Sequence, residues 1–263
     1  MFQTDARMAK RARWASLVGT SLESYDFYIY AYFAAFFVGP LFFDPLGGFG
    51  GTLAAFLSIA LAFVIRPVGA ILFGHIGDRI GRRKTLIATV TLMGVATGLI
   101  GVLPTYEQAG WVGGALLVLL RLLQGISLGG EWGGAVLVAT EHETGARRAF
   151  AAAMPQLGSP IGSILSATAF IWLTMALTSE EIVEWAWRIP FWTAIPLLLV
   201  SLWLRVMVSE TPVFEKLVAK DRRPRVPLVA LLKAQPAAIF VAVAVALLGI
   251  GSYSLMNTYT INY

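Results

Sequence analysis

The sequence predicts an all-α fold that crosses a membrane several times. Of its 263 residues, 57% are hydrophobic and 13% are charged, which is about half the charged share of a soluble domain; the mean hydropathy is +0.73. The chain also contains seven apolar runs of at least 18 residues, and each is long enough for a helix to span the roughly 30 Å hydrocarbon layer. They are Trp14–Val38, Phe49–Phe73, Leu86–Leu103, Trp111–Thr140, Phe150–Leu177, Ile189–Val208 and Ala237–Met256.

The ends of these runs carry helix breakers, as expected for separate spans: Pro104, Gly110, Pro190 and Pro236. A transmembrane β-barrel would instead need segments of about ten residues with strict alternation, which the sequence lacks. The first run follows basic residues, as a secretory signal does. It is too long for one, contains two acids and has no convincing cleavage site, so we expect a retained first span.

Charges alternate between the connections. Before the first run and in the even-numbered connections lie 17 of the 20 Lys and Arg residues, with Arg205 counted in the sixth connection. Acids occupy the odd-numbered connections, at Asp44, Glu107, Glu180, Glu181 and Glu184. Because basic residues favour the cytoplasmic side, we expect a cytoplasmic amino terminus and a carboxyl terminus on the outer side. The pI near 9.6 then reflects orientation anchors, and no nucleic-acid partner is expected.

Two acids interrupt the first run. Glu23 and Asp26 together raise the free energy of membrane insertion by about 5–7 kcal/mol, which is more than the apolar residues of that run lower it. Gly19, Glu23, Asp26 and Tyr30 recur at steps of four, three and four residues, so they share one helical face. We expect that face to point inward, toward partner helices or a water-filled cavity.

The fourth run also carries polar groups. Gln124 and Glu131 are seven residues apart and share a face, whereas Arg121 lies roughly 15 Å from Glu131 along the helix axis. We therefore expect Arg121 and Glu131 to find partners on other helices, a bound ion or water. Glycines at 125, 129, 130, 133 and 134 let another backbone approach. Further polar stripes are expected at Gln156, Ser159 and Ser163 and at Tyr253 and Asn257.

Ionisable groups at membrane depth point to function by default. A carboxyl in low dielectric can exchange a proton near neutral pH, so Asp26 and Glu131 are the first candidates. Arg121 fits either a structural ion pair or a role in binding and proton transfer, and Glu23 fits either function or the cytoplasmic interface. Arg66, beside a proline, is assigned a structural role.

Several chemistries are excluded. The absence of cysteine rules out disulfides, iron–sulfur clusters and thiol nucleophiles. His75 and His142 are too few for a histidine-rich metal site, and both are placed in solvated connections. An intramembrane enzyme would need a nucleophile or metal motif such as G-x-S-x-G or H-E-x-x-H, and neither occurs. We expect no enzyme activity and no cofactor other than protons as a coupling ion.

The second connection reads GHIGDRIGRRKT, and its glycines predict a tight turn between two spans. It is not a nucleotide-binding loop, because it lacks G-x-x-x-x-G-K-[ST] and a preceding strand. Asp78 can accept hydrogen bonds from arginines or from a helix amino terminus, which predicts a charged latch at the membrane surface. The gating residues expected here are Gly74, Asp78, Arg79, Gly81, Arg82 and Arg83.

At this point the sequence resembles the major facilitator superfamily, and more closely its metabolite:proton symporter branch of shikimate, α-ketoglutarate, citrate and proline or betaine transporters. The resemblance lies in ESYDF (Glu23–Phe27), RPVGAILFGHIGDRIGRR (Arg66–Arg83), RLLQGISLGGEWGGA (Arg121–Ala135) and SETPVF (Ser209–Phe214). The sequence GSPIG at Gly158–Gly162 matches the antiporter motif of the superfamily only in part, because a serine is inserted before the proline. This departure argues against drug export.

The resemblance implies a gating role for Asp78 and a link between Arg121 and proton coupling. It also implies twelve helices in two halves, of which this chain holds a six-helix bundle at 1–208, a cytoplasmic linker at 209–235 and about one helix of the second half at 236–263. The chain is then a fragment, or needs a second polypeptide, and does not transport alone.

The function expected from these features is alternating-access import of a small polar metabolite, first an organic acid, into bacteria across the inner membrane with protons. A proline or betaine importer and a non-transporting receptor or assembly protein remain alternatives. The expected substrate and proton pathway comprises Glu23, Asp26, Tyr30, Arg121, Gln124, Glu131, Gln156, Ser159, Tyr253 and Asn257.

Overall fold

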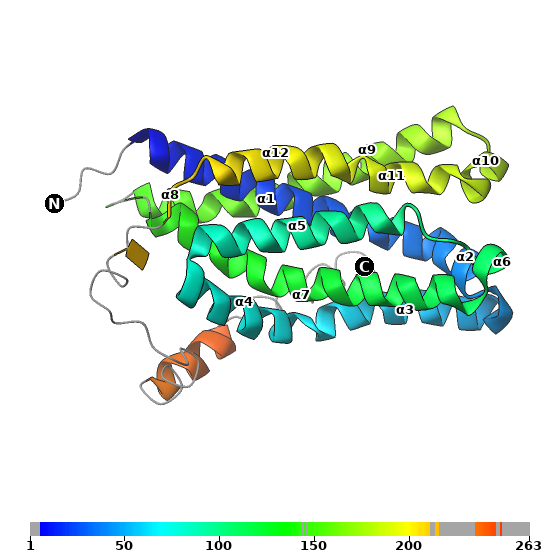
Figure 1. Ribbon diagram of the computed structural model, residues 1–263, viewed down its shortest axis with the longest axis horizontal. Helices are drawn as coiled ribbons and strands as arrows, with labels where there is room; N and C mark the ends of the chain where they lie inside the picture. Colours follow the sequence, from blue (N-terminus) through cyan, green and yellow to red (C-terminus); the bar gives the residue numbers. More distant parts are fainter. Residues whose placement is uncertain are drawn as a thin grey trace, which may run out of the picture. The chain divides into compact units, whose positions relative to one another are not determined.

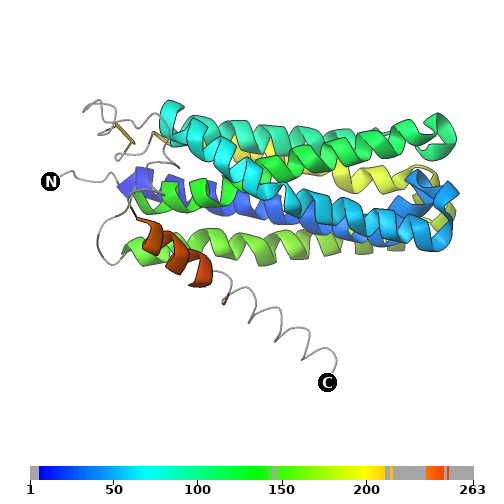
Figure 2. The ribbon, with the colours of Figure 1, turned by 90° about the horizontal axis from the view of Figure 1, so that it is seen from below.

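The computed structural model describes residues 6–141, 143, 145, 147–210, 214–215, 235–245 and 248, whose regular structure is entirely helical. The chain divides into two units, Met1–Asp221 and Arg222–Tyr263. In the first unit the long helices run side by side along one direction (Figures 1 and 2). The described part of the second unit includes one short apolar helix, Pro236–Val245.

The α-helices of the first unit are α1 (Ala6–Phe33), α2 (Gly39–Phe42), α3 (Gly47–Val64), α4 (Arg66–Ile80), α5 (Arg82–Ile100), α6 (Tyr106–Ala109), α7 (Trp111–Glu141), α8 (Arg147–Ala153), α9 (Gly158–Ala176), α10 (Ser179–Glu184), α11 (Ile189–Trp192) and α12 (Ala194–Val206). A π-helical turn, Ala34–Val38, joins α1 to α2, and 3₁₀ turns lie at Asp44–Leu46, Met154–Leu157 and Ala186–Arg188.

Within the described residues, five helices are long and apolar enough to cross a membrane. They are Asp44–Ile80, Arg82–Ile100, Trp111–Glu141, Arg147–Ala176 and Ala186–Val206, and they coincide with the second to sixth apolar runs. The first run is helical as predicted, within Ala6–Phe42, but it is more polar than these five because it carries Glu23 and Asp26. Most of the seventh run lies outside the described residues.

Two groups of helices meet around α7. This helix packs against α3, α4, α5 and α1, while α1 also packs against α9 and α12. Aromatic rings join α1 to the segment before α12: Phe33 stacks on Trp187 with ring centroids 4.9 Å apart, and it meets Phe191 edge to face with centroids 5.0 Å apart. The inner face of α1 is therefore covered on several sides.

Close helix packing depends on glycine where α7 meets the α3–α4 pair. A Cβ atom at Gly125 would collide with the carbonyl oxygen of Ala62, and one at Gly129 with that of Arg66. The predicted close backbone approach is confirmed at these two positions. It is wrong for Gly133, which has open space beside it.

The α4–α5 junction is shorter than the sequence predicts. Helix α4 continues to Ile80, so most of the glycine-rich motif is helical, and His75 lies within α4 rather than in a connection. Only Gly81 breaks the helix, with a φ of +111° that favours glycine. The tight turn is thus one residue long, and α5 begins directly after it.

Candidate functional site

A buried carboxylate lies at the centre of the bundle. Asp26 of α1 is 1% exposed, and its Oδ1 accepts hydrogen bonds from the Thr97 hydroxyl of α5 and from Nε2 of Gln124 on α7, the latter at 2.7 Å. Arg121 Nη1 lies 4.0 Å from Asp26 Oδ2 and donates to Gln124 Oε1 at 2.7 Å. We call these four residues the Asp26 network.

Tyr30 extends the network by one turn of α1. Its hydroxyl lies 2.5 Å from the Ser58 hydroxyl of α3, and the Arg121 guanidinium carbon lies 3.7 Å from the centre of the Tyr30 ring. A cation over an aromatic face is attracted to it, most strongly where water is excluded. The ring therefore holds Arg121 in place beside Asp26.

The two oxygens of Asp26 have different surroundings. Oδ1 accepts from two donors, whereas Oδ2 is buried and has no hydrogen-bond partner among the described residues. Arg121 at 4.0 Å attracts the charged carboxylate without occupying this oxygen. A proton can therefore be placed on Oδ2 without the loss of an existing hydrogen bond.

A second buried charge pair lies nearer the end of the bundle where α1 begins. Glu131 of α7 accepts directly from Nη2 of Arg205 on α12, and Nη1 of Arg205 donates to the Leu86 carbonyl of α5 at 2.8 Å. Thr89 also lies within hydrogen-bond distance of Glu131, at 3.4 Å. A Cβ atom at Gly19 of α1 would collide with the Arg205 guanidinium, so glycine makes room for it.

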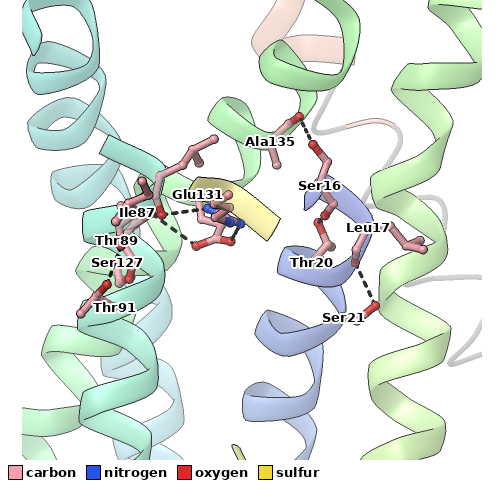
Figure 3. A network of polar contacts seen from close by, with 12 residues as sticks. Ser16, Leu17, Thr20, Ser21, Ile87, Thr89, Thr91, Ser127, Glu131 and Ala135 are labelled. Carbon is pink, nitrogen blue, oxygen red and sulfur yellow. Dashed lines mark hydrogen bonds and ion pairs between the residues drawn. The ribbon is translucent and has the colours of Figure 1, made fainter. Parts of the chain in front are cut away.

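Figure 3 shows Glu131 among bonds that join neighbouring helices. Glu131 lies beside Thr89 and Ser127, and the Ser127 hydroxyl donates to the Thr89 carbonyl at 2.5 Å. Nearby, the Ser16 hydroxyl of α1 donates to the Ala135 carbonyl of α7 at 2.9 Å. Four helices, α1, α5, α7 and α12, are thus joined around one ion pair.

The sequence-based expectation that Arg121 and Glu131 find partners on other helices is confirmed, with Asp26 and Arg205 as the nearest opposite charges. The assignment of Arg205 to a basic connection is wrong. It lies inside α12 and is 4% exposed, because the carboxylate of Glu131 compensates its charge. The sequence did contain a signal for this pairing. Arg205 lies within the sixth apolar run, and the fourth run holds an acid, Glu131, that needs a basic partner.

The glycine-rich motif forms a charged cluster at the α4–α5 junction. Asp78 accepts from Arg82 at 2.5 Å, as expected. The amino terminus of α5 is instead capped by Glu210, which accepts from the backbone N–H groups of Arg82 at 2.9 Å and Arg83 at 3.1 Å. Arg83 also donates to the Val206 carbonyl at 2.5 Å. Glu210 was not among the expected gating residues, although it lies in the SETPVF motif.

The remaining gating residues lie around this junction: Gly74 and Arg79 are in α4, and Gly81 ends it. Among the pathway residues, Tyr30 shares the buried face of α1 with Asp26, as does Gly19, while Glu23 is only partly buried. Gln156 is exposed on a 3₁₀ turn and is not brought to Asp26. Tyr253 and Asn257 lie outside the described residues.

Glu23 and Ser159 instead line a separate cavity of about 220 Å³ between α1, α9 and the α3–α4 pair. Arg66, assigned a structural role from the sequence, lines it as well. Among the described residues no cluster of three or more His, Asp or Glu side chains could hold a metal ion.

The sequence matches the family described as sugar (and other) transporter over residues 12–226. Its relatives include the inner membrane metabolite transport protein YhjE of Escherichia coli K12, 43% identical over 95% of this chain and 54% of that protein. The shikimate transporter of the same strain is 37% identical over 97% and 59%. A putative proline/betaine transporter of Staphylococcus aureus (strain COL) is 36% identical over 98% and 56%.

The chain therefore spans about half the length of the curated relatives that it matches. Among solved structures, the proton:xylose symporter XylE bound to 6-bromo-6-deoxy-D-glucose superposes with a TM-score of 0.74 over 86% of this chain and 50% of that chain, at 16% identity. At this identity the likeness shows the fold alone.

Proposed function

Since this chain belongs to the sugar (and other) transporter family of the major facilitator superfamily, we propose that it forms the proton-exchanging half of a symporter that imports a small polar metabolite. Its relatives are transporters rather than enzymes, and it is a multi-pass membrane protein. The proposal places it in a bacterial inner membrane with a cytoplasmic amino terminus. A second half, from further sequence or another polypeptide, would complete the transport path.

The observation that carries this proposal is the Asp26 network. An acid in a transmembrane segment is costly and is kept where it has a role. Asp26 is buried and faces Arg121 at 4.0 Å, with one carboxyl oxygen free of hydrogen bonds among the described residues. This arrangement supports a carboxyl that alternates between a protonated and a charged state.

The network suggests how a proton could be coupled to movement. Arg121 balances the charge of Asp26, so an anionic substrate would add a net negative charge to the site. Protonation of Asp26 leaves Arg121 to balance the substrate, and the two halves can then close around it without burying a net negative charge. When the site opens to the cytoplasm, the nearby Arg121 guanidinium favours the charged carboxylate and so favours release of the proton. Gln124 and Thr97 keep the carboxyl in position in both states.

Two substrate classes fit this proposal. Both carry a carboxylate: organic acids, represented by the shikimate transporter, and zwitterions, represented by the putative proline/betaine transporter. The two relatives are almost equally similar to this chain, at 37% and 36% identity. An organic acid is the first candidate from the sequence, and a compatible-solute importer is the second.

Uptake of labelled substrate into vesicles, by this chain together with its second half, tests the proposal. One proton moving down a gradient of one pH unit can drive roughly tenfold accumulation, because 1.4 kcal/mol corresponds to a factor of ten. We expect Asp26→Asn to abolish this accumulation while exchange across the membrane continues.

Asp44→Asn is the matched control, because Asp44 is exposed and should leave accumulation intact. Accumulation by Asp26→Asn at the wild-type level would contradict the role of this acid. Binding without any uptake would instead indicate a receptor or assembly protein built on a carrier scaffold.

A further inference from the structure

Two opposite charges face one cavity without forming an ion pair. Glu23 of α1 and Arg66, the first residue of α4, both line the cavity of about 220 Å³. Among the described residues, no carboxylate oxygen lies within 4.0 Å of the Arg66 guanidinium nitrogens. The cavity thus separates a cation from an anion.

Each of these side chains also has a buried polar atom without a hydrogen bond. Glu23 Oε2 and Arg66 Nε are both inaccessible to solvent and have no hydrogen-bond partner among the described residues. A buried polar group without a partner is costly, and more so when it is charged. Through the cavity that both side chains line, a ligand with a cationic and an anionic group would place an opposite charge beside each of them.

Aromatic rings give the cavity a second feature that favours a cation. Phe27, Tyr28 and Phe63 line it, and the Phe27 ring meets those of Tyr28 and Phe63 edge to face, with centroids 5.2 and 5.5 Å away. The Arg66 guanidinium carbon lies 4.1 Å from the centre of the Phe63 ring, which holds this arginine in place. Phe27 and Tyr28 remain available for a ligand cation beside Glu23.

The cavity is distinct from the Asp26 network. None of the bonds of that network involves Glu23 or Arg66. The apolar helix is interrupted at Ile65, and Pro67 at the second position of α4 starts the new helix and places Arg66 at the break. A substrate at this break and a proton on Asp26 can therefore occupy separate places.

We propose that this cavity is a substrate subsite for a small zwitterion, with the carboxylate on Arg66 and a quaternary or secondary ammonium group between Glu23 and the Phe27 and Tyr28 rings. The inference rests on the proposed function of the chain as one half of a carrier. An anion alone would leave the charge of Glu23 without an opposite charge in the ligand. A neutral polyol would offer an opposite charge to neither Glu23 nor Arg66. A zwitterion keeps the site neutral and places an opposite charge beside each member of the pair.

Binding measurements on the full 263-residue chain in lipid nanodiscs test this subsite. The probes are labelled trimethylglycine as the zwitterion and labelled shikimate as the anion. We expect trimethylglycine to bind at least about tenfold more tightly than shikimate. Glu23→Gln removes the negative charge beside the quaternary ammonium group, and the lost Coulombic attraction should weaken trimethylglycine binding by about tenfold or more, whereas shikimate binding should stay the same or tighten. Arg66→Gln should weaken both ligands.

Matched controls are Glu180→Gln on α10 and Arg148→Gln on α8, which remove exposed charges outside the cavity and should bind as wild type does. Ser159→Leu fills the cavity while both charges stay, so it should reduce trimethylglycine binding even if a charge variant fails to fold. Tighter binding of shikimate than of trimethylglycine, no binding of trimethylglycine, or indifference to the Glu23, Arg66 and Ser159 exchanges would overturn the subsite.

Failure of the subsite and failure of the carrier function give different results. One result supports the carrier function and contradicts the subsite. In it, uptake is driven by a pH gradient and depends on Asp26, but trimethylglycine affinity is unchanged by the Glu23 and Arg66 substitutions. If trimethylglycine binds as expected but is never taken up by the completed protein, the subsite stands and the carrier function is wrong.

Discussion

The two buried charge pairs of the bundle differ in how closely their charges meet. Glu131 and Arg205 are in direct contact, and Arg205 is also bonded to a backbone carbonyl. Asp26 and Arg121 are 4.0 Å apart and are connected through the side chain of Gln124. Both carboxyl oxygens of Glu131 accept a hydrogen bond, from Arg205 and Thr89, whereas Asp26 Oδ2 accepts none among the described residues.

This difference suggests a division of roles between the pairs. A buried ion pair in direct contact loses several kcal/mol if one partner is removed, so it holds its helices in one arrangement. A pair that is separated, with intermediate hydrogen bonds, can lose its negative charge to a proton with less rearrangement. We therefore assign stability to the Glu131–Arg205 pair and proton exchange to the Asp26 network.

The largest expected effect is on stability. Arg205→Met leaves the Glu131 carboxylate buried without its cation, and we expect the free energy of unfolding to fall by about 3–5 kcal/mol. Arg121→Met should cost less, because Asp26 keeps its bonds from Thr97 and Gln124. Denaturant unfolding in detergent micelles measures both values.

The double variant Glu131→Leu with Arg205→Met is the control for this prediction. It removes both charges and fills the space with apolar side chains, so it should recover most of the lost stability. An equal loss for Arg121→Met and Arg205→Met would break the proposed division between the two pairs.

A smaller effect is expected from the glycine that makes room for Arg205. Gly19→Ala places a Cβ atom against the guanidinium, and such overpacking costs about 1–3 kcal/mol. Gly133→Ala is the matched control, since Gly133 has open space and alanine in a helix interior is better by about 0.5–1 kcal/mol. In an Arg205→Met background, Gly19→Ala should cost little. Thermal unfolding of the three variants checks this, and a full cost in that background would contradict the packing argument.

Much of the architecture could be predicted from the sequence, because a helix of apolar residues needs only length and composition to be recognised. The intramembrane charges Asp26, Arg121 and Glu131 were also found, since each interrupts an apolar run at a clear free-energy cost. The helical course of residues 74–80 was missed. Gly74 and Gly77 suggested a turn, but Gly77 is buried in a packing contact, which compensates for its low helix propensity.

The partners in the site were harder to predict, because they depend on contacts between distant positions. Gln124 and Asp26 are 98 residues apart, and Arg205 and Glu131 are 74 apart. Arg205 and Glu210 lie beside a basic segment, where a charge needs no special explanation. Only the folded arrangement shows that one pairs with a buried acid and the other caps α5.

The smallest expected effect is on the Asp26 side. Tyr30→Phe removes a hydroxyl that meets Ser58, but Ser58 keeps its bond to the Ala55 carbonyl at 2.6 Å, so the cost should be about 0.5–1.5 kcal/mol. Phenylalanine retains the ring beneath Arg121, and pH-driven accumulation should persist.

Tyr30→Leu separates the two roles of this side chain. Leucine removes the aromatic face that holds the Arg121 guanidinium, so Arg121 is no longer fixed beside Asp26 and the accumulation ratio should fall more than with Tyr30→Phe. Uptake measured in parallel for both variants shows whether the ring or the hydroxyl of Tyr30 supports coupling. If Tyr30→Phe lowers accumulation as much as Tyr30→Leu, the hydroxyl rather than the ring supports coupling. The separated pair would then depend on the bond to Ser58 and α3, and not on the position of the arginine.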